Sequence, residues 1–179
     1  MKGGYVYLHN FSQAVLEQLV KLKSVNISGN SLGQLVLEMM VNPPIEGVSR
    51  ETKMKYLTET SNLLDSLKHR AKLLTKHLNE MTNIRTKEIE GAMCTFPEIK
   101  FSEKAIKAAE KEGREPDLFY CLEVLRNTGI ALVPGSGFNQ KTGTYHFRIT
   151  NLILPESRME TRLNTFKNFN ESFHAKYQD

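Results

Sequence analysis

The middle of the chain carries the longest regular pattern in the sequence. From about Ser49 to Met81, mostly apolar residues recur at alternating spacings of three and four, which is typical of one face of an α-helix. The residues of this seam are Leu57, Thr60, Leu64, Leu67, Ala71, Leu74, Leu78 and Met81. Such a helix either joins a coiled coil, in which Thr60 and Ala71 would weaken two layers, or lies along a sheet. The second interpretation is favoured in a chain of 179 residues.

The segments before this helix predict a strand and two shorter helices. β-branched and aromatic residues from Gly4 to His9 favour a strand, although nothing upstream offers it a partner. Helical spacing then recurs at Val15, Leu16, Leu19 and Val20. It recurs again from Leu32 to Met40, and Asn42–Pro44 ends that helix because proline lacks an amide donor and bars the residue before it from a helix.

The second half of the chain alternates between strand and helix patterns. Predicted strands lie at Gly91–Ile99, Gly129–Pro134 and Gly143–Thr150, and predicted helices at about Ser102–Lys111, at Pro116–Gly129 and after Pro155. Proline suits the first turn of a helix and glycine suits its end. The last helix places five apolar residues on one face, namely Met159, Leu163, Phe166, Phe173 and Tyr177. This order predicts a compact α+β domain.

Composition argues against several classes of protein. Cys94 and Cys121 lie far apart without a matching Cys/His ladder, which argues against a disulfide framework or a zinc module and favours a reducing setting. No apolar run reaches membrane-spanning length, and His9 comes too early for a signal-peptide core. The formal net charge of +4 is spread along the chain. We therefore expect a cytoplasmic protein with no nucleic-acid, membrane or metal partner.

One predicted strand carries a charged residue in its middle. In "GTYHFRIT", Gly143 to Thr150, the period of two places Phe147 and Ile149 on one face and Arg148 on the other. A guanidinium within a strand needs a carboxylate partner, a ligand anion or solvent. Solvent exposure is the commonest of these settings for a single strand arginine, so the pattern alone leaves all three open.

The stretch before Arg148 is rich in glycine, but other signals of a catalytic site are weak. Val133–Gly143 begins at the end of a predicted strand, where such backbone permits either close approach to a ligand or a plain hairpin. The histidines are scattered, and no acid or nucleophile stands at a telling spacing from them. The sequence contains no catalytic triad, P-loop or dinucleotide fingerprint.

Several motifs together resemble a known family. They are "KGGY" at Lys2–Tyr5, "GQLVLEMMVNPP" at Gly33–Pro44, "GAMCTFP" at Gly91–Pro97, "PDLFYCLEVLRNTGIALVPGSGF" at Pro116–Phe138 and "GTYHFRIT". In order and spacing they resemble the C-terminal part of alanine aminotransferases along essentially the whole chain. The resemblance implies a fold-type-I, pyridoxal-phosphate-dependent transferase, homodimeric in the family, that exchanges an amino group between L-alanine and 2-oxoglutarate to give pyruvate and L-glutamate.

The resemblance also assigns roles to particular residues. At the position of Arg148 the family has the arginine that holds the substrate α-carboxylate, and the loop Gly135, Ser136, Gly137 and Phe138 borders the same pocket. Lys2 stands where the family has a phosphate-binding arginine, and it would bind the cofactor phosphate as a point charge. Residues 1–48 are then an incomplete tail of the cofactor-binding large domain. Residues 49–179 are the small C-terminal domain, a short sheet packed against helices with one long helix.

The chain departs from the family pattern in ways that bear on activity. The family's Schiff-base lysine lies before its Arg-Gly-Gly-Tyr segment, so we expect this chain to lack it, to bind no cofactor by itself and to be inactive alone. Leu32 replaces a serine, and Asn151 resembles an insertion after the Arg148 strand. Two other hypotheses stay open: a helical oligomerisation or interaction module based on the Leu57–Met81 seam, and a nucleic-acid binder based on the positive charge.

Overall fold

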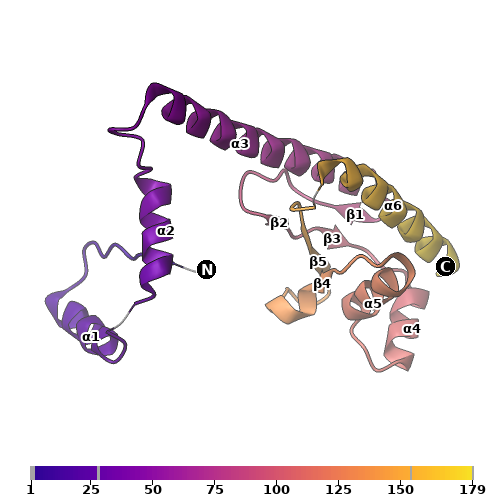
Figure 1. The fold of residues 1–179 in the computed structure, drawn as a ribbon. Helices are drawn as coiled ribbons and strands as arrows, with labels where there is room; N and C mark the ends of the chain where they lie inside the picture. The colour runs from indigo at the N-terminus through magenta and orange to yellow at the C-terminus, as the bar shows by residue number, and fades with distance from the viewer. Residues whose placement is uncertain (1–2, 28, 154, 179) are drawn as a thin grey trace. The chain divides into compact units, whose positions relative to one another are not determined.

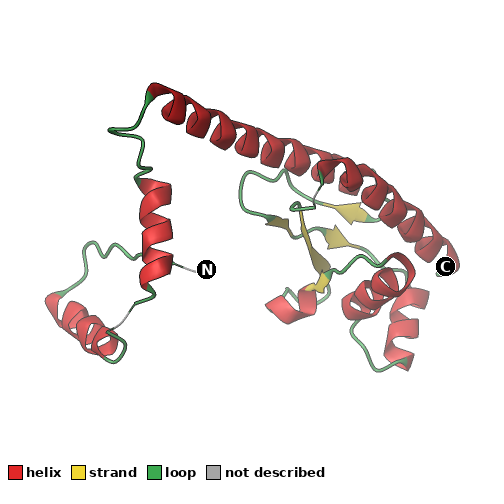
Figure 2. Ribbon diagram, viewed as in Figure 1, coloured by secondary structure: helices red, strands yellow, loops and turns green. Residues whose placement is uncertain are grey.

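The computed structural model describes residues 3–27, 29–153 and 155–178 (Figure 1). The chain divides into two compact units, Met1–Glu59 and Thr60–Asp179. Figure 2 shows helices in both units and strands in the second. None of the helices in the described ranges is both long and apolar enough to cross a membrane.

The first unit contains two of the three expected elements. Helix α1 (Gln13–Ser24) and helix α2 (Ser31–Val41) form as predicted, and α2 ends just before the proline pair. The expected strand at Gly4–His9 is wrong, because the structure assigns no strand there and Tyr5, Val6 and Tyr7 remain 78–80% exposed. A strand is stable only when its backbone pairs with another strand, and the described part of this unit offers none.

The long helix α3 (Arg50–Asn79) is present (Figure 1). The residues of its seam are buried unevenly. Its buried residues all lie in the C-terminal half, at Arg70, Ala71, Leu74 and Leu78. Leu74 and Leu78 join the core of the second unit, so this half of α3 packs into that core. Leu57 and Leu64, in the first half of the seam, are exposed by 44% and 52%.

The second unit is built around an antiparallel sheet. Its strands are β1 (Ile84–Arg85), β2 (Cys94–Thr95), β3 (Glu98–Ile99), β4 (Val133–Pro134) and β5 (Tyr145–Thr150). They pair in the order β1-β3-β5-β2, and β4 also pairs with β5. β5 is therefore the central strand, with β3, β2 and β4 all bonded to it.

Several strands differ from the predicted ones. The single strand expected at Gly91–Ile99 is interrupted at Phe96 and Pro97, because proline cannot donate to a strand ladder. The strand expected at Gly129–Pro134 shortens to β4. β1 was not predicted, since two residues are too few to show a period.

Helices α4 (Glu103–Lys111), α5 (Pro116–Thr128) and α6 (Met159–Lys176) complete the second unit. Ser102 caps α4 by accepting the Ala105 backbone N–H at 3.2 Å. Gly129 ends α5 with a φ of 71°, a left-handed conformation that suits glycine. Single 3-10 turns lie at Gly135–Phe138 (η1) and Glu156–Arg158 (η2).

The core lies between these helices and one face of the sheet. Phe147 and Ile149 of β5 are buried there, as the alternation predicted. They pack with residues from each helix, among them Leu78, Ala109, Phe119, Tyr120, Val124, Leu163, Phe166 and Phe173. Tyr120 donates its hydroxyl to Asn170 Oδ1 at 2.8 Å, which satisfies two buried polar groups. The α+β fold class is confirmed. The opposite face of β5 is not covered by this core and carries the exposed Arg148.

Candidate anion-binding site on strand β5

Arg148 projects from the face of β5 opposite the core. The burial pattern along Tyr145–Thr150 makes Phe147 and Ile149 buried and Arg148 exposed. Arg148 pairs in register with Val133 of β4, so β4 on one side and β2 on the other hold its backbone in the sheet. No acidic side chain of the described residues forms an ion pair with its guanidinium. Of the three settings considered for Arg148, a carboxylate partner within the described chain is therefore absent.

Phe138 supplies an aromatic surface for Arg148. The guanidinium carbon lies 5.2 Å from the centroid of the Phe138 ring, within the range of a cation–π interaction. Phe138 is the last residue of η1, which follows β4 directly. The contact leaves the polar edge of the guanidinium available to a planar anion, which it can bind through two parallel hydrogen bonds.

Gly135 explains why the loop before Phe138 needs glycine. Gly135 is buried, and a Cβ added to it would lie 2.8 Å from the His146 carbonyl oxygen and 2.9 Å from the His146 Cβ. Real Cβ atoms do not approach backbone this closely, so a side chain here would push the loop off β5. At Gly137 an added Cβ would meet nothing within 4 Å.

A buried carboxylate holds the same loop from the other side. Asp117, in the first turn of α5, is 1% exposed. Its Oδ2 accepts the Ser136 backbone N–H at 2.5 Å and the Gln140 side-chain amide at 3.0 Å. Its Oδ1 accepts the Leu118 N–H at 2.9 Å. Three donors compensate the desolvation of the charge, so the η1 loop is bonded to a helix of the core.

Asp117 also affects the neighbouring thiol. Burial, and secondly the negative charge of Asp117, raise the pKa of Cys121 to about 12. This thiol is therefore protonated at neutral pH and does not act as a nucleophile.

Three ring side chains contact one another beside Arg148, and Gln140 contacts the first of them. The Gln140 Oε1 lies 3.1 Å from His146 Nδ1, and the His146 ring stacks on Phe96 with centroids 4.9 Å apart and planes 2° apart. Phe96 meets the Phe138 ring edge-on at 5.5 Å. The rings of His146, Phe96 and Phe138 thus fix the surface under Arg148 from three different segments.

The structure brings together part of the residue set expected from the sequence. Gly135 and Phe138 are placed by their contacts around Arg148, and Ser136 enters the network through its backbone N–H. Gly137 is exposed and has no such constraint. Lys2 lies outside the described residues. Four further residues of the site, Asp117, Gln140, His146 and Phe96, were not expected from the sequence, because no fixed spacing links them before the chain folds.

The described residues do not by themselves fit a site for pyridoxal phosphate. An imine-forming lysine works from a desolvated pocket or beside another cation. Every lysine in the described ranges is exposed except Lys167, which is partly exposed and lies 3.8 Å from Glu80. The same residues contain no group of three or more His, Cys, Asp or Glu side chains placed to hold a metal. The arrangement around Arg148 is suited to binding a carboxylate.

Solved structures that share this fold are aminotransferases. The chain resembles fold-type-I aminotransferases over 88% of its length. The chain is similar to an alanine aminotransferase from Pyrococcus furiosus, with a TM-score of 0.63 and 27% identity over 88% of this chain and 34% of that one. It also shares the fold of an aspartate aminotransferase from Rhizobium meliloti, with a TM-score of 0.58 and 20% identity over 88% of this chain and 36% of that one. No protein-family model matches the chain.

The curated relatives of the chain are named as alanine aminotransferases and glutamate–glyoxylate aminotransferases. A probable mitochondrial alanine aminotransferase of Dictyostelium discoideum is 42% identical over 99% of this chain and 33% of its own length. Alanine aminotransferase 2 of Xenopus laevis is 40% identical over 98% of this chain and 32% of its own length. Glutamate–glyoxylate aminotransferase 2 of Arabidopsis thaliana is 41% identical over 99% of this chain and 36% of its own length. The resemblance to the C-terminal portion of alanine aminotransferases is confirmed, and the chain spans about a third of the length of these relatives.

Proposed function

We propose that this chain is the C-terminal, substrate-carboxylate-binding portion of a pyridoxal-phosphate-dependent alanine aminotransferase. The intact enzyme would convert L-alanine and 2-oxoglutarate to pyruvate and L-glutamate. One observation carries the proposal: Arg148 stands on the open face of a central strand with no ion pair among the described residues, beside the ring of Phe138. Curated alanine aminotransferases about 40% identical over nearly the whole chain support it.

Arg148 would bind the α-carboxylate of the amino or oxo acid. Two parallel charge-assisted hydrogen bonds from a guanidinium fix both the position and the orientation of a carboxylate. Gly135, Ser136, Gly137 and Phe138 would border the same pocket. The sheet and the Asp117 network would keep this surface rigid before substrate arrives.

The cofactor would be bound by residues that this chain does not supply in full. Pyridoxal phosphate serves such enzymes as an electron sink at the substrate carbon. Since none of the described lysines is desolvated, we expect the chain alone to be inactive. We assign residues 1–48 to the large cofactor-binding domain and 49–179 to the small domain, with Lys2 near the cofactor phosphate. We propose a homodimer as the intact form and a cytoplasmic location, although some relatives are named as mitochondrial.

A hybrid enzyme tests this function. The chain replaces the matching third of the Dictyostelium alanine aminotransferase, and pyruvate formation from L-alanine is measured with 2-oxoglutarate or glyoxylate as acceptor. The proposal predicts turnover by the hybrid and none by the chain alone. The relative named as a glutamate–glyoxylate aminotransferase makes glyoxylate the informative second acceptor. A hybrid that folds and binds the cofactor, yet turns over neither acceptor, would contradict the proposal.

The alternative of a helical interaction module rests on α3. Its exposed Leu57 and Leu64 are the observation in favour. A module of this kind would form a stable oligomer through the first half of α3, and the hybrid would be inactive. Substituting Leu57 and Leu64 with Gln would then abolish the oligomer formed by the chain alone.

A further inference from the structure

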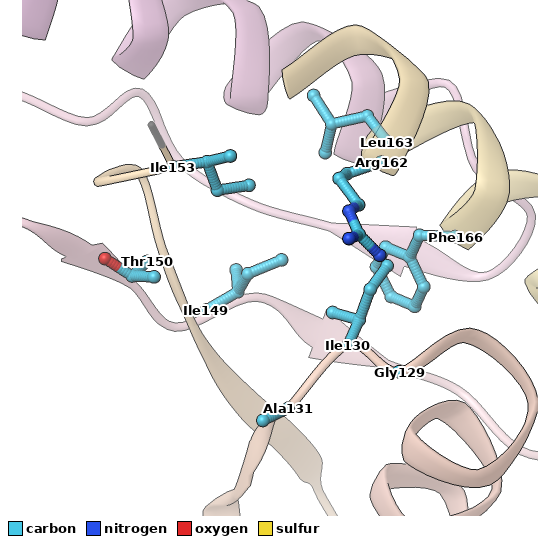
Figure 3. A pocket seen from close by; sticks show the side chains of 9 residues that line it. All are labelled: Gly129, Ile130, Ala131, Ile149, Thr150, Ile153, Arg162, Leu163 and Phe166. Atoms are coloured by element: carbon cyan, nitrogen blue, oxygen red, sulfur yellow. The ribbon is translucent and has the colours of Figure 1, made fainter. Parts of the chain in front are cut away.

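A pocket lies on the core side of the sheet, and Arg148 is not among its lining residues. It has a volume of about 210 Å³ and opens between β5, the start of α6 and the segment that follows α5 (Figure 3). Ile149, Leu163 and Phe166, at most 5% exposed, contribute to its lining, and Ile130 and Ile153 add further apolar surface. All of these residues belong to the second unit. Because most of the lining residues are aliphatic or aromatic, the surface of the pocket is almost entirely apolar.

Arg162 is the one charged side chain that lines this pocket. Figure 3 shows its guanidinium extending from α6 beside Phe166 toward Ile130. Within the described ranges no acidic group forms an ion pair with it. The neighbours three and four residues away on the helix surface are Arg158, Met159, Thr165 and Phe166, so none of them is an acid.

The nearest acids in sequence lie elsewhere. Glu156 and Glu160 line a different surface pocket together with His69 and Leu73 of α3. Glu156 is engaged there, since it accepts the Ser66 hydroxyl at 2.7 Å and lies 3.5 Å from His69. The hydroxyl of Thr150, the only other polar side-chain group of the Arg162 pocket, donates to the Met93 carbonyl at 2.8 Å. A ligand would thus find a single polar anchor in the pocket, and that anchor is positive.

We propose that this pocket binds a small monocarboxylate with an apolar body, such as an aliphatic acid of about six carbons or a one-ring aromatic acid. Arg162 would bind the carboxylate, and the apolar body would contact Ile149, Leu163 and Phe166. A cavity of about 150 Å³ lined by similar residues holds benzene, so the volume here suits one ring or a short chain together with its carboxylate. Burial of the apolar body removes it from water, and charge complementarity fixes its direction. The site is separate from Arg148 and does not depend on the proposed function.

Titration of the 179-residue chain tests the pocket directly. Hexanoate and benzoate are added, with hexanol as the neutral control, and the methyl signals of isoleucine and valine are followed by NMR. We expect saturable shifts at Ile130, Ile149 and Ile153 with a dissociation constant of about 1 mM or below for the acids. Hexanol should bind at least about tenfold more weakly, because it lacks the charge.

Two variants test the two properties that the proposal needs, the positive charge and the free volume of the pocket. Arg162→Met keeps an unbranched apolar stem and removes the charge, and should weaken the acids by about tenfold to a hundredfold. Ala131→Leu keeps the charge but fills the opposite edge seen in Figure 3, and should also abolish the shifts. Arg126→Met, on the exposed surface of α5, is the matched control and should bind like the unmodified chain.

Four outcomes would overturn the proposal. The first three are the absence of saturable shifts at up to 20 mM acid (about twentyfold above the expected constant), unchanged affinity in a folded Arg162→Met variant, and hexanol binding as tightly as hexanoate. Shifts confined to Val133, which pairs with Arg148, would show that the acids bind at the β5 site instead, and would also contradict it.

Discussion

Asp117 Oδ2 accepts the backbone N–H of Ser136 at 2.5 Å, although the two residues are 19 positions apart. This bond joins the first turn of α5 to the loop that precedes Phe138. Phe138 in turn lies under the guanidinium of Arg148. The position of the aromatic surface at the candidate site therefore depends on a buried carboxylate that contacts no part of Arg148 in the structure.

Replacing Asp117 should lower stability strongly. Asp117→Ala removes a buried carboxylate and leaves the part-buried Ser136 N–H and Gln140 amide without their acceptor, so we expect a loss of about 3 kcal/mol in the free energy of unfolding. Urea unfolding of the chain measures this. The control is Asp65→Ala on the exposed surface of α3, which should change stability by about 0.5 kcal/mol or less. Equal effects of the two substitutions would refute the role given to Asp117.

Two glycines of one loop should respond differently to alanine. Gly135→Ala forces a Cβ against the His146 backbone and should cost about 1–3 kcal/mol. Gly137→Ala meets open space and should be nearly neutral, within about 0.5 kcal/mol. The pair is compared by thermal unfolding of the two variants. If Gly137→Ala proved the more damaging, the packing of η1 on β5 would be wrong.

The two cysteines should differ in their reaction with a thiol reagent. Cys121 is buried and its pKa is raised to about 12, whereas Cys94 is only partly buried. At pH 8 we expect one thiol of the native chain to react quickly and the second to react only on unfolding. Repeating the assay on Cys94→Ser should leave no fast thiol. A fast-reacting Cys121 would show that the α5 face is not packed as described.

The partly buried His174 ring should make the free energy of unfolding depend on pH. Burial lowers the pKa of His174 below the usual 6.5, and the charge of Glu171 opposes this shift. The unfolded chain then binds the proton more tightly, so the stability conferred by neutral His174 is complete above pH 6.5 and is lost as pH falls through the folded-state pKa. Urea unfolding between pH 7 and pH 5 should show a smaller decrease in His174→Gln. An NMR titration of His174 with its midpoint above 6.5 would contradict the sign.

Helix positions were predicted from local sequence signals, whereas strand pairing depends on contacts between residues far apart in the sequence. Helix α5 begins at Pro116 and ends before Gly129, because each of these residues restricts or frees the conformation of its own backbone. The strand expected at Gly4–His9 failed because pairing depends on a partner, which propensity does not reveal. The alternation around Arg148 was sufficient to place its side chain on the open face of β5.

The network behind the candidate site was beyond sequence reasoning for a different reason. Asp117 was unremarkable as an acid in a helical first turn, where acids are common. Its bonds to Ser136 and Gln140 span 19 and 23 residues, so only the fold brings them together. His146 was discounted because no catalytic partner stands near it in sequence, and its observed contacts are the Gln140 amide and the Phe96 ring.

The substitution Arg148→Lys in the hybrid enzyme described above tests the central claim most directly. An ammonium cannot reproduce the two parallel bonds of a guanidinium, so kcat/KM for L-alanine should fall at least about a hundredfold. The melting temperature should change little, since Arg148 is exposed and forms no ion pair with the described residues. Arg126→Lys, on the exposed surface of α5, should keep both values. A hybrid carrying Arg148→Lys that melts early yet retains near-normal kcat/KM would show that Arg148 is structural and does not hold the substrate carboxylate.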